Sequence, residues 1–152
     1  MPREITDLVI RDVPTLRKDQ TVREAVAATL QAKLPALPVV DDRERFAGVF
    51  GEREFMEALF PGYLGKLQSA GFVRRSMDEV LEKRQACALE TVGRHMNTEH
   101  VEVPADFSDL QIAEVFLHHR VLIVPVVEDG RVAGVVTRSE FFRTLAERFL
   151  AG

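Results

Sequence analysis

The chain of 152 residues contains a single cysteine, Cys87, one tyrosine and no tryptophan. One cysteine cannot form an intrachain disulfide, which favours a reducing, cytoplasmic compartment. The longest apolar run, VLIVPVV at 121–127, is far shorter than the roughly 20 residues that span a bilayer. The first residues, MPREITDL, include acidic side chains and lack the apolar stretch of a secretory signal. We therefore expect a cytoplasmic protein that does not contact a membrane.

Positive charge is not in excess either. Lys and Arg number 20 against 24 Asp and Glu, which gives a net charge of −4. Binding to nucleic acid relies on clustered Lys and Arg that neutralise phosphates. The Arg74-Arg75 pair is too short to form such a cluster, so the sequence predicts no nucleic-acid partner. The hydrophobic fraction of 46% is typical of a folded globular domain.

Side chains suited to metal binding or catalysis are sparse. The histidines are His95, His100, His118 and His119, and their spacing with Cys87 matches no metal-ligand pattern. No Ser/His/Asp or Cys/His arrangement stands out. We therefore expect no metal, no required cofactor and no enzymatic activity, and we assign the histidines a structural or surface role.

What the chain does contain is an internal repeat. The stretch LPVVDDRERFAGVFGEREF at 37–55 returns as VPVVEDGRVAGVVTRSEF at 124–141. A repeat of this kind determines the architecture, because each copy forms one supersecondary unit and the copies pack on one another.

Each copy carries the signals of a helix followed by a hairpin and a second helix. Thr21 with Glu24, and Ser108 with Gln111, form capping boxes that predict helix starts. The β-branched runs that follow predict buried strands, with Pro38 and Pro125 where each strand begins. After each hairpin we expect a second helix, over 52–60 in the first copy and 138–150 in the second.

The predicted fold is therefore mixed α+β or α/β, with two strand–helix–strand–strand–helix repeats packed about a pseudo-two-fold axis. The repeats occupy 1–60 and 92–152, and a helical insert occupies 61–91. In the insert we expect a turn at Pro61-Gly62 and a helix capped by Ser76 and Glu79. The insert either covers one end of the molecule or forms a dimer contact.

With both copies in view, the chain resembles a tandem pair of CBS domains, the regulatory modules named after cystathionine β-synthase. The run GVVTRSE at 134–140 is similar to the family's Gly-hydrophobic-hydrophobic-Thr/Ser-x-x-Asp/Asn signature. The runs LPVVDD and VPVVED are similar to its Leu-Pro-Val-Val-Asp stretch. The resemblance implies two clefts between the paired domains that bind AMP, ADP, ATP or S-adenosylmethionine, and it implies a disc-like homodimer.

The favoured candidate site is in the second repeat. A strand that leads into a helix N-terminus presents backbone N–H groups suited to phosphate, with Thr137 as a hydroxyl and Arg138 as a charge. The resemblance gives Glu140 the role of accepting hydrogen bonds from the ribose hydroxyls. It further implies four residues that flank the adenine: Ile123, Pro125, Glu102 and Val103. Thr137 and Glu140 also form a capping box worth ~1 kcal/mol, which explains both residues without a ligand.

The first repeat departs from the family pattern. It has Gly51 in place of Thr or Ser, and Glu54, like Glu140, stands where the family prefers Asp. Gly51 leaves bare backbone open to an anion, with Arg53 close by, and Thr15 is the residue expected beside the adenine. We expect this cleft to be the weaker or empty one.

Taken together, these patterns predict a non-enzymatic sensor of adenosine nucleotides that forms a homodimer and acts on a protein partner whose identity the sequence does not give. The alternative is a scaffold without ligand, used for protein–protein contacts or dimerisation. The helical spacing of Phe141, Phe142, Leu145 and Phe149 indicates either core packing or a subunit contact.

Overall fold

The computed structural model describes residues 4–60, 77–99 and 101–152 of the chain. The elements of the first repeat are β1 (Leu16–Arg17), α1 (Val22–Ala32), β2 (Ala36–Val40), β3 (Phe46–Gly51) and α2 (Glu52–Leu59). Those of the second are α6 (Asp109–His118), β4 (Ile123–Glu128), β5 (Arg131–Thr137) and α7 (Arg138–Ala151). Val103 pairs in parallel with Val126 and takes the place that β1 has in the first repeat. The predicted order of elements is confirmed.

Both predicted capping boxes start their helices. The backbone N–H of Glu24 donates to Thr21 Oγ1 at 3.1 Å, and that of Gln111 donates to Ser108 Oγ at 3.2 Å. The reciprocal bonds to the two cap residues are also present. Each bond satisfies a backbone donor that the first turn leaves unpaired.

Each repeat begins with a short helix, η1 (Ile5–Leu8) in the first and α5 (Val92–His95) in the second. The insert contributes α4 (Met77–Lys83) and η2 (Gln85–Leu89). The helix predicted at the end of the insert is present as α4. The predicted turn at Pro61-Gly62, the Ser76 cap, the Arg74-Arg75 pair and His100 lie outside the described residues.

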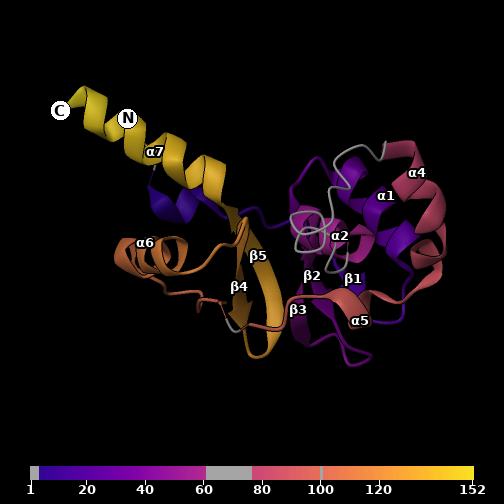
Figure 1. Ribbon diagram of the computed structural model, residues 1–152. Coiled ribbons are helices and arrows are strands. Elements are labelled where there is room, and N and C mark those ends of the chain that lie inside the picture. Colours follow the sequence, from indigo (N-terminus) through magenta and orange to yellow (C-terminus); the bar gives the residue numbers. More distant parts are fainter. Residues whose placement is uncertain (1–3, 61–76, 100) are drawn as a thin grey trace.

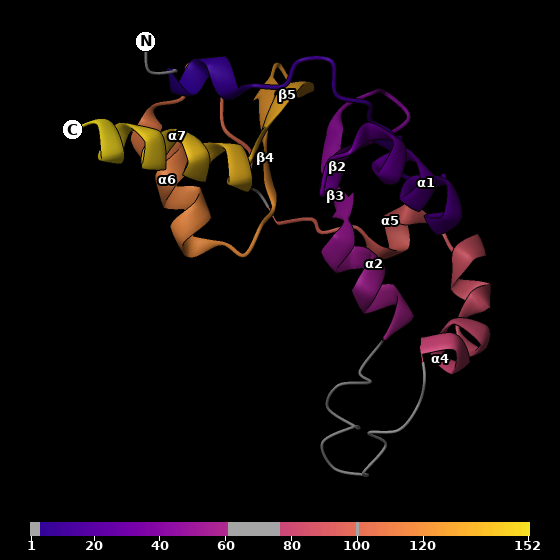
Figure 2. The ribbon, with the colours of Figure 1, turned by 90° about the horizontal axis from the view of Figure 1, so that it is seen from above.

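The two sheets face each other across the middle of the molecule, and the long helices lie on the outer sides (Figures 1 and 2). Strands β1, β2 and β3 form one sheet in that order, and β4 and β5 form the other. The buried side chains between the sheets are Ala36, Val49, Ile123 and Val135. The shared interface is therefore built from the matching strands of both repeats, as the pseudo-two-fold axis predicts.

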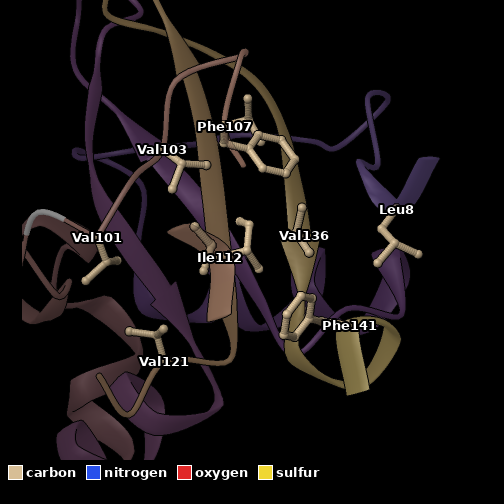
Figure 3. Close-up of a cluster of buried hydrophobic side chains, with 10 residues drawn as sticks. Leu8, Val101, Val103, Phe107, Ile112, Val121, Val136 and Phe141 are labelled. Carbon is tan, nitrogen blue, oxygen red and sulfur yellow. The ribbon is translucent and has the colours of Figure 1, made fainter. Parts of the chain in front are cut away.

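Each repeat lends its first segment to the sheet of the other (Figure 2). Ile10 exchanges two backbone hydrogen bonds with Val135 of β5, and Asn97 exchanges two with Val49 of β3. Leu8 consequently lies in the core of the second repeat, beside Phe141 and Val136 (Figure 3). We call 7–10 and 95–99 the lead-in segments. Their exchange ties the repeats together through backbone bonds as well as through apolar contacts.

The exchange explains where the two prolines lie. Pro38 and Pro125 are the third residues of β2 and β4 rather than the first, so the predicted position is corrected by two residues. Pro38 pairs with Val49 and Pro125 with Val135. The N–H and C=O groups of both valines form hydrogen bonds with the lead-in segments. Their carbonyl oxygens therefore need no N–H donor from the prolines.

The lead-in segments approach the sheets most closely at two glycines. A Cβ on Gly134 would lie 2.6 Å from Val9 Cγ1 and 2.7 Å from Ile10 O, and one on Gly48 would lie 2.6 Å from Asn97 O. The matched Ala-Gly-Val runs of the repeat therefore mark the crossing points of the exchanged segments.

We expect Gly134→Ala to lower the free energy of unfolding by about 1–3 kcal/mol, because the added methyl overpacks the crossing of the lead-in segment. Urea denaturation followed by circular dichroism measures this loss. Gly152→Ala is the matched control, since its Cβ meets only ordinary contacts, the nearest at 3.6 Å. Equal stability of the two variants would contradict the tight crossing.

Candidate functional site

Two clefts open between the repeats, each at the start of the helix that follows a hairpin. The Thr137 cleft has a volume of about 430 Å³ and lies at the N-terminus of α7. Its walls are Thr137, Ser139 and Glu140 from the second repeat, with the lead-in segment 7–10 and the loop 33–35 from the first. The cleft therefore needs walls from both repeats.

The Glu54 cleft is its counterpart at the N-terminus of α2, with a volume of about 580 Å³. Its walls are Arg53, Glu54 and Glu57 from the first repeat, with the lead-in segment 95–99 and the loop 118–121 from the second. The two clefts are equivalent under the repeat, because each joins a helix start to the lead-in segment and the α–β loop of the opposite half.

The structure brings together only part of the residues predicted for the second-repeat site. Thr137 and Glu140 meet in the Thr137 cleft. Arg138 is exposed, and its backbone N–H donates to Leu122 O at 3.0 Å. The four residues predicted to flank the adenine stand apart from the described lining of this cleft: Ile123 and Val103 are buried in the core, Pro125 is buried and its carbonyl accepts from Val103 N, and Glu102 is half-buried.

The first-repeat prediction divides in the same way. Arg53 and Glu54 line the Glu54 cleft. Gly51 forms the N-cap of α2 beside it, and Thr15 is exposed in the segment before β1. Neither Gly51 nor Thr15 is among the described residues that line the cleft.

Sequence reasoning missed the walls that come from the opposite repeat. It expected clefts between the repeats but named residues from one copy only for each cleft, whereas Leu8 and Ile10 from the lead-in segment and Lys33 from the loop 33–35 join Thr137. It also assigned the histidines a structural or surface role, yet His95, His118 and His119 line the Glu54 cleft. The available signal was the repeat itself, since Lys33 and Arg120 occupy matching places in the two α–β loops.

The two glutamates of the motif are held differently. Glu54 is only 8% exposed, and its Oε1 accepts a 2.9 Å hydrogen bond from the Gly51 N–H, so the carboxyl caps its own helix. Burial raises the pKa of the Glu54 carboxyl above its ordinary value. The Glu140 side chain is 32% exposed, with Oε1 3.7 Å from Arg143 Nε, while Thr137 Oγ1 accepts from its backbone N–H. Glu140 is thus the motif carboxylate that solvent and a ligand can reach.

Gly51 is constrained by packing. A Cβ at this position would collide with Ala36 and with Pro35 O at the start of β2. The hydroxyl that Thr137 supplies to one cleft therefore has no room for a counterpart in the other without movement of the β2–β3 hairpin.

Among the described residues no group of three or more His, Cys, Asp or Glu side chains is arranged to hold a metal ion. Cys87 is buried, and desolvation raises the pKa of its thiol, which keeps the sulfur protonated. No helix in the described part of the chain has both the length and the apolar character that crossing a membrane requires.

A fold of two exchanged strand–helix–strand–strand–helix repeats with paired clefts defines a class of tandem-repeat modules. The family model for the CBS domain matches this chain twice, over residues 5–61 and 92–147. The chain therefore belongs to the CBS domain family, as the resemblance of its motifs predicted.

Known proteins share this architecture. The chain is similar to the CBS domain of a CBS domain-containing membrane protein from Sphaerobacter thermophilus, with 25% identity, a TM-score of 0.70, and coverage of 94% of this chain and 86% of that one. It also resembles CBSX2 in a crystal structure with AMP, with 20% identity, a TM-score of 0.67, and coverage of 95% and 96%.

A longer relative contains the module as one part. The chain is 22% identical over 142 residues to inosine-5'-monophosphate dehydrogenase from Methanocaldococcus jannaschii. This match covers 93% of the chain but only 23% of the dehydrogenase. CBS pairs thus occur inside enzymes as well as by themselves, and this chain corresponds to the pair.

We expect the stability of the protein to depend on the ionisation of Glu54. Because burial raises the pKa of its carboxyl in the folded state, the unfolded chain releases this proton first as the pH rises above about 4.5. The contribution of protonated Glu54 to the free energy of unfolding is fully present below that pH, and it is lost as the pH rises through the folded-state pKa. Glu54→Gln keeps the acceptor for Gly51 N–H, so the free energy of unfolding of this variant should decline less over this range.

Denaturation midpoints of both proteins between pH 4 and pH 8 test this expectation. Glu57→Gln serves as the control, since Glu57 lies on the same helix but is exposed. Parallel pH profiles for wild type and Glu54→Gln would show that the buried carboxyl carries no such penalty.

Proposed function

We propose that the protein is a non-enzymatic regulatory module that binds an adenosine nucleotide in the Thr137 cleft and transmits its occupancy to a protein partner. The observation that carries the proposal is the meeting of Thr137 and Glu140 with the lead-in segment 7–10 and Lys33 around one cavity. The complex of the related CBSX2 with AMP supports the choice of ligand.

The walls of the Thr137 cleft match the parts of such a nucleotide. The half-buried side chains of Val9, Ile10 and Leu34 provide apolar surface for a base. The Glu140 carboxylate is the acceptor for ribose hydroxyls. The N-terminus of α7 and the exposed Lys33 ammonium attract phosphate. The volume of about 430 Å³ lies within the usual range for small-molecule sites.

Transmission follows from the position of the cleft. A ligand there touches α7 of the second repeat and the lead-in segment of the first at once. It favours the arrangement of the two halves in which both sets of contacts are made, and a shift of that equilibrium changes the surface offered to a partner. The cytoplasmic location belongs to the same proposal, rests on the single cysteine, and is checked by cell fractionation.

We expect AMP to bind the wild-type protein, and Glu140→Gln and Lys33→Gln each to weaken it about tenfold, since each removes one charge-assisted contact. Isothermal titration calorimetry with AMP, ADP, ATP and S-adenosylmethionine measures the affinities. Arg43→Gln, in the exposed turn after β2, controls for the change of charge. If none of the four compounds binds at millimolar concentration, the chain acts as the ligand-free scaffold instead.

We further propose a homodimer that uses the outer face of α7. Phe141 is buried in the core, but Phe142, Leu145 and Phe149 are 68%, 47% and 83% exposed and follow one another at helical spacing. Large apolar side chains gathered in this way on one helix face are typical of a contact with another protein surface. A second copy of the chain offers the same apolar stripe, so the contact can be symmetric.

The double variant Phe142→Ser, Phe149→Ser should be monomeric in sedimentation velocity experiments at concentrations where the wild type is dimeric. Its circular dichroism spectrum should stay unchanged, because both side chains are exposed. Leu89→Ser tests the insert in the same way, since Leu89 is 76% exposed in η2. A dimer that survives the double variant but dissociates with Leu89→Ser would place the contact on the insert.

A further inference from the structure

We propose that the Glu54 cleft is a second site with a different ligand class: it binds a polyphosphate chain and does not read the adenosine. Binding of polyphosphate at this site does not depend on the binding of a nucleotide in the Thr137 cleft. The shared chemistry is a run of linked phosphates, as in a nucleoside triphosphate or in inorganic tripolyphosphate.

The first observation is a convergence of basic side chains without partners. Arg53 comes from α2 of the first repeat, and His118 and Arg120 come from the α6–β4 loop of the second. Within the part of the chain that the structure describes, these three side chains make no hydrogen bond and no ion pair. Two guanidinium groups that face one cavity repel each other, and an anion between them removes the repulsion.

The other charged groups of the cleft leave the guanidinium groups of Arg53 and Arg120 available. Glu54 is turned toward the Gly51 N–H. His95 contacts Glu90 at 3.3 Å, and His119 contacts Glu99 at 3.5 Å. Glu57 lies one turn after Arg53 and is exposed, as are His118 and Arg120, so solvent screens the charges on both walls.

The second observation concerns the sugar. In the Thr137 cleft a solvent-accessible carboxylate lies at the helix start, beside Thr137, which is 4% exposed and whose Oγ1 caps the helix, whereas the Glu54 cleft has Gly51 and a carboxyl that is 8% exposed. The packing of Gly51 against Ala36 leaves no room for a side chain there. A ribose therefore finds neither contact in the Glu54 cleft, and recognition falls to the phosphates.

The third observation comes from the matching positions of the two clefts. Arg120 corresponds to Lys33, so each cleft has one cation in its α–β loop. Arg53 corresponds to Ser139, which adds a second cation on the opposite wall of the Glu54 cleft only. With its larger volume, about 580 Å³ against 430 Å³, this cleft suits a longer and more highly charged anion.

The test uses the full chain and titrates it with inorganic tripolyphosphate, GTP, ATP and AMP at low and at physiological salt. We expect tripolyphosphate and GTP to bind within a few-fold of each other. Arg53→Gln and Arg120→Gln should each weaken both about tenfold, and raised salt should weaken them further. Arg43→Gln, in the exposed turn after β2 and outside both clefts, is the matched control and should leave tripolyphosphate binding unchanged.

Three results would overturn the proposal: no binding of tripolyphosphate, binding that neither Arg53→Gln nor Arg120→Gln weakens, or ATP binding that Arg53→Gln weakens and that is more than tenfold tighter than the binding of both GTP and tripolyphosphate. The last result would mean that the cleft reads adenosine. The two arginine variants are tested separately, so a folding defect in one leaves the other decisive. Loss of AMP binding in Lys33→Gln bears on the Thr137 cleft alone, which separates failure of this proposal from failure of the nucleotide proposal.

Discussion

The close crossing of the lead-in segments over the opposite sheets is the constraint on which the rest of the molecule depends. Ile10 on Val135 and Asn97 on Val49 are paired by backbone hydrogen bonds, and Gly134 and Gly48 leave the space for them. Neither repeat is complete without the segment that the other lends. For the same reason neither cleft belongs to one repeat, and a ligand in either of them must contact both halves.

The insert is connected to the first repeat and to the Glu54 cleft through contacts around Glu90. Glu90 contacts Arg84, Arg94 and His95, and Arg84 also donates to Ala58 O at the end of α2. Helix α2 begins at the Glu54 cleft, and His95 lines that cleft. Charged contacts therefore join the end of the insert both to α2 and to His95 in the wall of the Glu54 cleft.

The symmetry of the repeat is imperfect where chemistry matters most. Identical glycines and valines maintain the crossing points. However, Gly51 corresponds to Thr137 in the other repeat, and Arg53 corresponds to Ser139. One cleft thus keeps a hydroxyl and an accessible carboxylate, and the other gains cations. A duplicated fold with equal halves would hold two copies of one site, whereas these differences favour two sites with separate ligands.

The sequence by itself determined the repeat, its order of elements, the capped helices and the two helix starts that face the clefts, because these depend on local spacing and on backbone donors within a few residues. It could not place Lys33, Leu8 or the histidines in a site, nor show that Ile123 and Val103 stand apart from the cleft lining. These positions depend on long-range pairing of strands, and only the tertiary structure decides which repeat supplies each wall. The reach of the motif carboxylates was decided in the same way, since Glu54 is turned inward onto the Gly51 N–H while Glu140 stays accessible.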